Sequence, residues 1–73
     1  MNTNKQIRAI GQQIKYLRKK KSWLQRDVAK ASKVALNIVS DVENGKRQEV
    51  TFRVLQRILE SLGASLEVKE NTK

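Results

Sequence analysis

The fold is decided by residues 25–45, which read QRDVAKASKVALNIVSDVENG. The spacing of apolar residues predicts a short helix over 25–31 and a second over about 35–44, with the break Ser-Lys-Val between them. The pair Asn44-Gly45 is a typical helix stop, because both residue types tolerate the left-handed backbone conformation. Each helix is too short to be stable alone, so both must pack against other parts of the chain.

Two further helices are predicted on either side of this segment. Apolar residues recur at helical spacing from residue 5 to 20, and this helix is expected to end near Lys21. The other begins after Thr51, a good N-cap, and is closed by Gly63. The two apolar stripes are Ile7, Ile10, Ile14 and Leu17, and Phe52, Leu55, Ile58, Leu59 and Leu62. Gly11 interrupts the first stripe at a cost of about 1 kcal/mol relative to alanine, so we expect close packing there.

Residues 64–70, ASLEVKE, alternate apolar and polar side chains, which predicts a β-strand. No other segment has a strand pattern, so the expected partner is the same strand of a second subunit, and a frayed tail is the alternative. The residues expected in this dimer contact are Leu62, Ala64, Leu66 and Val68. The sequence therefore predicts one compact all-α domain over residues 1–73, with four to five helices, a core at 5–63 and a C-terminal strand that pairs across a dimer.

The composition excludes several classes of protein. The 73 residues include no Cys, His or Pro, so a disulfide framework, the commonest metal ligands and the usual general base are missing. We expect no metal, no cofactor and no enzymatic activity. No apolar run approaches the ~20 residues that span a bilayer, and the N-terminus lacks the apolar core of a signal peptide, so a cytoplasmic location is expected.

The charge is strongly asymmetric along the chain. The formal net charge is +9, residues 1–26 contain no acid, and all 7 acidic residues lie from Asp27 onward. The electrostatic field of such a basic segment attracts polyanions, namely nucleic acid or an anionic membrane surface. A charge that served only solubility would not need to be concentrated in one half of the chain. The membrane is disfavoured because the basic stretch lacks a broad apolar face to bury.

The two central helices form a helix-turn-helix, whose second helix fits a DNA major groove about 12 Å wide. With Val39 and Val42 turned inward, its outward residues are Leu36, Asn37, Ser40 and Asp41. Asparagine pairs with adenine, serine bonds several base edges, aspartate accepts from cytosine N4, and leucine touches a thymine methyl. A solvated face without a partner is the alternative, and exposure of both Leu36 and Ile38 favours contact.

Residues 10–62 resemble the XRE/Cro-type helix-turn-helix family of phage repressors and bacterial regulators, whose fold is lambda-repressor-like. The similarity lies in IGQQIKYLRKKKSWLQ and in QRDVAKASKVALNIVSDVENGKR. It implies a buried ion pair between Arg18 and Glu43, and a Gln25 that contacts a phosphate and in some relatives a base. The implied or expected phosphate contacts are Asn44, Lys46, Arg47, Lys21 and Lys33.

The sequence departs from the family pattern at the caps and at the turn. Leu24 and Ala35 replace the usual Ser or Thr caps, and the absence of such a cap costs about 1 kcal/mol. Lys33 stands at the usual turn glycine, and a positive φ is uncommon for lysine, so we expect a strained turn.

Within the family, SWLQ and TFRVLQRILESLGASLEV are similar to HipB-type antitoxins. This resemblance implies a homodimer that represses its own operon at palindromic DNA and docks onto a HipA-type kinase toxin. Two alternatives stay open: a freestanding phage-type or bacterial XRE regulator without a toxin, and a basic protein-interaction module. A steep salt dependence is expected for DNA binding and a shallow one for an apolar protein interface.

Overall fold

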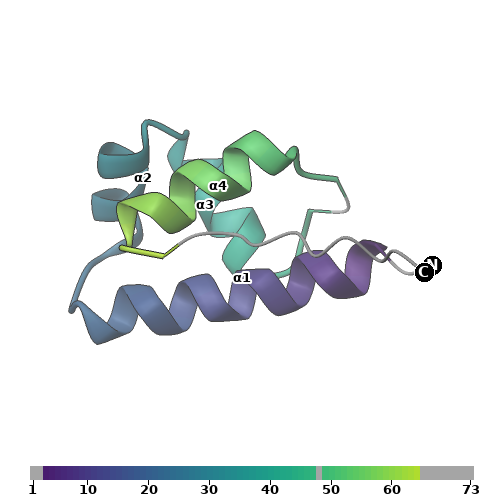
Figure 1. Ribbon diagram of the computed structural model, residues 1–73, viewed down its shortest axis with the longest axis horizontal. Coiled ribbons are helices and arrows are strands. Elements are labelled where there is room, and N and C mark those ends of the chain that lie inside the picture. Colours follow the sequence, from purple (N-terminus) through teal and green to yellow (C-terminus); the bar gives the residue numbers. More distant parts are fainter. Residues whose placement is uncertain (1–2, 48, 65–73) are drawn as a thin grey trace, which may run out of the picture.

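The described part of the chain consists of four helices, and α1 runs along one side of the other three (Figure 1). The computed structural model describes residues 3–47 and 49–64. The elements in chain order are α1 (Thr3–Lys20), α2 (Gln25–Ser32), α3 (Leu36–Glu43) and α4 (Phe52–Ser61). The all-α prediction is therefore confirmed. The predicted strand at 64–70 lies outside the described residues apart from Ala64.

The predicted helix ends agree with the structure to within two residues, which is the usual uncertainty of such boundaries. Ala35 and Asn44, predicted as the ends of the third helix, are its N-cap and C-cap. Thr51 caps α4, because its Oγ1 accepts a hydrogen bond from the backbone N–H of Val54 at 3.2 Å. Gly63 follows the end of α4 with a φ of 79°, as expected for a C-terminal stop.

All four helices contribute to one apolar core. The most deeply buried side chains are Ile14 of α1, Val28 of α2, Val39 and Val42 of α3, and Ile58 of α4. Trp23, which lies between α1 and α2, packs against this core. Two expectations are wrong: Ile38 is half-buried against the core rather than exposed, and Phe52 is 52% exposed although it belongs to the α4 stripe.

Gly11 sets the distance between α1 and α3. A Cβ atom at this residue would overlap the backbone carbonyl of Val42 in α3, so only glycine lets the two helices approach this closely. The expected close packing is confirmed. It brings the C-terminal end of α3 against α1, which determines where the segment after α3 lies.

The turns around α2 carry local strain. Lys33 has φ 61° and ψ 35°, and Ser22 has φ 62°, so both adopt the left-handed conformation that costs a non-glycine residue about 1 kcal/mol. Leu24 provides no side-chain cap, but its backbone N–H donates to Asp27 Oδ2 at 2.7 Å. Ala35 likewise provides no side-chain cap for α3. The strained turn predicted at Lys33 is present, and tertiary packing must offset its cost.

Candidate nucleic-acid interface

A buried ion pair fixes α3 relative to α1. Arg18 Nε donates to Glu43 Oε2 at 2.7 Å, and Arg18 Nη2 donates to Glu43 Oε1 at 3.0 Å. The remaining nitrogen, Nη1, donates to the carbonyl oxygen of Trp23 at 2.7 Å. Both side chains are almost fully removed from solvent. The bidentate pairing therefore neutralises two buried charges, either of which would be costly to leave unpaired.

Gln25, the first residue of α2, joins the same network. Its Nε2 donates to Glu43 Oε1 at 3.1 Å, and its side chain is half-buried. The carboxylate of Glu43 therefore holds the C-terminal end of α1 and the N-terminal end of α2 against α3. The sequence does not predict this hydrogen bond, because the family resemblance implies only a DNA contact for Gln25.

The four residues of α3 that are predicted to contact bases differ in the exposure and in the contacts of their side chains. Leu36 is 49% exposed, and Asn37 is also exposed. Ser40 and Asp41 are half-buried: Ser40 Oγ accepts from Asn44 Nδ2 at 3.3 Å, and Asp41 Oδ2 lies 3.8 Å from Arg47 Nε. Leu36 and Asn37, at the leading end of α3, are thus the best placed to enter a groove.

The segment after α3 presents side chains rather than backbone donors. The backbone N–H groups of Asn44, Gly45 and Lys46 all donate to carbonyl oxygens of α3, at 3.0, 3.3 and 2.9 Å. Asn44 and Lys46 are exposed, and Arg47 is half-buried. Arg47 Nε is buried and has no hydrogen-bond partner among the described residues, since Asp41 is too distant for one.

Comparison with protein-family models gives a match to the model described as Helix-turn-helix, over residues 14–69. The chain belongs to the XRE-type helix-turn-helix family. The family comprises DNA-binding regulators. Comparisons with curated proteins and with solved structures give no significant match.

The other predicted phosphate contacts of this helix-turn-helix are Lys21, which directly follows α1, and Lys33, which directly follows α2. Lys21 is exposed, and its Nζ lies 5.1 Å from the ring centre of Trp23, a cation–π distance. Lys33 is exposed in the strained turn between α2 and α3. Neither forms an ion pair with an acid among the described residues.

The residues predicted to form the dimer contact are only partly described. Leu62 is 5% exposed and belongs to the core of its own chain, so its side chain is not free to contact a second subunit. Ala64 is half-buried and packs against the same core. Leu66 and Val68 lie outside the described residues.

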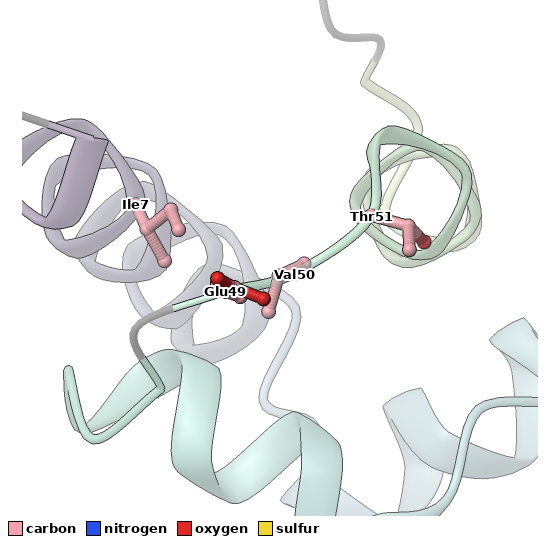
Figure 2. A pocket seen from close by; sticks show the side chains of 4 residues that line it. All are labelled: Ile7, Glu49, Val50 and Thr51. Carbon is pink, nitrogen blue, oxygen red and sulfur yellow. The ribbon is translucent and has the colours of Figure 1, made fainter.

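The helix-turn-helix also has a hollow between the first turns of α1 and the segment that leads into α4. It is lined by Ile7, Glu49, Val50 and Thr51, which come from these two separate parts of the chain (Figure 2). Over residues 3–47 and 49–64, no cluster of acidic, His or Cys residues is suited to hold a metal ion. No helix there is long and apolar enough to cross a membrane.

Proposed function

We propose that this protein binds operator DNA sequence-specifically as a homodimer and represses transcription. The observation that supports this most is the position of α3. Glu43 ties it to Arg18 and Gln25, while its opposite, leading end exposes Leu36 and Asn37. A helix held by its inner face, with free side chains at its N-terminal end, has the geometry needed to enter a major groove.

The candidate contacts divide into two groups. Leu36, Asn37, Ser40, Asp41 and Gln25 are proposed to contact bases, and Lys21, Lys33, Asn44, Lys46 and Arg47 are proposed to contact phosphates. Phosphate contacts determine affinity and register, whereas base contacts determine sequence preference. Asn37 is the strongest candidate for specificity, because its amide is exposed and can pair with adenine through two hydrogen bonds.

The finer proposal is an antitoxin that autoregulates a HipBA-like operon and docks onto a HipA-type kinase toxin in the cytoplasm. Its support is the similarity of SWLQ and of residues 51–68 to HipB-type antitoxins. We propose no enzymatic activity, no cofactor and no membrane partner. A freestanding XRE regulator without a toxin is the alternative that shares the same DNA contacts.

A protein-interaction module is the second candidate function. Its support is the set of large apolar side chains on the surface, of which Phe52 at the start of α4 is 52% exposed. Under this alternative the basic charge is incidental, and binding to the partner depends little on salt.

Selection of genomic DNA fragments by the purified protein at about 150 mM salt, which suppresses non-specific binding, tests the proposal. We expect enrichment of a short palindrome. Its location upstream of the protein's own gene and a neighbouring kinase-like gene would support the antitoxin. Bulk binding that depends on salt but enriches no sequence would instead favour the interaction module.

Asn37→Ala is the variant that tests base reading in the same selection. We expect relaxed preference at one position of each half-site, because removing a bidentate pair with a base costs about 1–3 kcal/mol. Gln13→Ala is the matched control, because Gln13 is an exposed amide on α1 that carries no proposed contact. An unchanged motif for Asn37→Ala would contradict its assignment.

A further inference from the structure

A basic side chain of α1 lies against the segment that follows α3. Gly45 has a φ of 67°, and a Cβ atom built on it would lie 3.2 Å from Cγ, 3.3 Å from Nε and 3.7 Å from Cδ of Arg8. The stem of Arg8 therefore lies against Gly45. The positive φ favours glycine at this position, and a larger residue would also push the Arg8 side chain away by a few tenths of an ångström. Local sequence patterns do not predict this approach, because α1 and the segment after α3 are far apart in the chain.

Arg8 lies close to the basic side chains that are proposed to contact DNA phosphates. Gly45 lies between Asn44 and Lys46 in the chain, so the guanidinium of Arg8 emerges beside the proposed phosphate-binding segment. Arg8 is exposed. Neither ion pair among the described residues involves Arg8.

A purely structural role for Arg8 is the competing explanation. A cation near the C-terminal end of α3 interacts favourably with the helix dipole. In such a role, the guanidinium often also bonds the last carbonyl oxygens of the helix. Among the side chains that the structure describes, within 6–47 and 49–64, Arg8 has no hydrogen-bond partner. The backbone donors of residues 44–46 already occupy three of the carbonyl oxygens of α3.

We propose that Arg8 contacts a DNA phosphate and extends the phosphate-binding surface from the segment after α3 onto α1. The inference rests on the proposed DNA binding. The surface consists of Arg8, Lys46 and Arg47. Because a phosphate contact carries no sequence information, Arg8 contributes equally to binding of the operator and of unrelated DNA.

Arg8→Gln tests this proposal by fluorescence anisotropy titrations of labelled duplex DNA over a range of salt concentrations. We expect the slope of log K against log salt to become shallower by about 0.9 for each phosphate that is no longer neutralised, which corresponds to about fivefold weaker binding per phosphate at 0.15 M salt. The weakening should be equal on the palindrome and on a random-sequence duplex. Arg8→Lys should largely retain the wild-type slope, because it keeps the charge.

Arg57→Gln is the matched control, since Arg57 is exposed on α4, a helix that carries no proposed DNA contact. It removes the same charge and should change the slope much less than Arg8→Gln. A melting temperature lowered only in Arg8→Gln, with an unchanged salt slope, would establish the structural role and overturn the proposal. Equal slopes for the two glutamine variants would overturn it too.

The same titrations distinguish failure of this inference from failure of the proposed function. If the wild-type protein prefers no sequence, operator binding fails, but the random-sequence duplex still reports the phosphate contact of Arg8. If the wild-type protein prefers the palindrome and Arg8→Gln has the wild-type slope on both duplexes, only the inference about Arg8 is wrong.

Discussion

At the scale of single residues, two opposed roles can be proposed for Asp41, and one substitution distinguishes them. Its carboxylate lies 3.8 Å from Arg47 Nε, and it also lies on α3 among the proposed base contacts. We expect Asp41→Asn to bind all DNA sequences more tightly, because it removes a negative charge near phosphates and a carboxylate that competes with them for Arg47. Anisotropy titrations should show a steeper salt slope, by up to about 0.9 for one additional phosphate neutralised.

If Asp41 instead accepts a hydrogen bond from cytosine N4, Asp41→Asn has the opposite signature. Binding to the palindrome then weakens by about 1–3 kcal/mol while binding to random-sequence DNA does not. Asp27→Asn is a suitable control for the change in net charge. Because Asp27 accepts the backbone N–H of Leu24 at 2.7 Å, the melting temperature of this control is measured alongside its DNA binding.

At the scale of helices and turns, the turn between α2 and α3 is strained at Lys33, where φ is 61°. Lys33→Gly should relieve about 1 kcal/mol of left-handed strain, partly offset by the greater freedom of glycine in the unfolded chain. We expect a higher free energy of unfolding in urea and a melting temperature raised by a few degrees.

Ala31→Gly is the control for this prediction. Ala31 is exposed inside α2, two residues before Lys33, where glycine should lower stability by about 1 kcal/mol. Glycine is thus expected to stabilise one position and destabilise the other. A decrease of stability in both variants would show that the lysine side chain contributes more than its backbone strain costs.

Local patterns predict the helices well because caps, stops and apolar spacing act within a few residues. Thr51 lies directly before α4 and Gly63 lies shortly after it, as expected for residues that start and stop a helix. Such patterns predict which face of a helix is apolar, but they do not predict which other element packs against that face. Phe52 lies on the apolar stripe of α4, yet no described element buries it, and Ile38 is covered although it lies off the stripe of α3.

The contacts that hold the candidate interface are harder to predict for the same reason. The hydrogen bond from Gln25 to Glu43 and the approach of Arg8 to Gly45 both depend on how α1 and α2 pack against α3. The close approach of α1 to α3 in turn needs a residue without a side chain at position 11. The sequence shows that Gly11 interrupts the apolar stripe of the first helix. The spacing of residues does not predict which helix packs against this glycine. Family resemblance, rather than spacing, predicts the pairing of Arg18 with Glu43.

At the scale of the whole molecule, the proposed mechanism requires two copies of the chain. Two recognition helices related by a twofold axis should lie about 34 Å apart, which matches one turn of B-DNA. Leu62 lies in the core of its own chain, so the proposed dimer contact falls to Ala64, Leu66 and Val68. A charge at Leu66 should therefore dissociate the dimer without disturbing the core of the four helices.

We expect sedimentation of the wild-type protein as a dimer and of Leu66→Asp as a monomer with unchanged helix content. The monomeric variant should bind a single half-site with the affinity of one wild-type subunit. On the palindrome it should bind more weakly than the wild-type dimer, in which binding of one subunit holds the second near its half-site. Glu67→Lys is the control, because it changes charge at the adjacent, alternate position of the predicted strand. If Leu66→Asp remains a dimer that binds the palindrome normally, the subunits associate through another surface, and the exposed Phe52 at the start of α4 is the first to test.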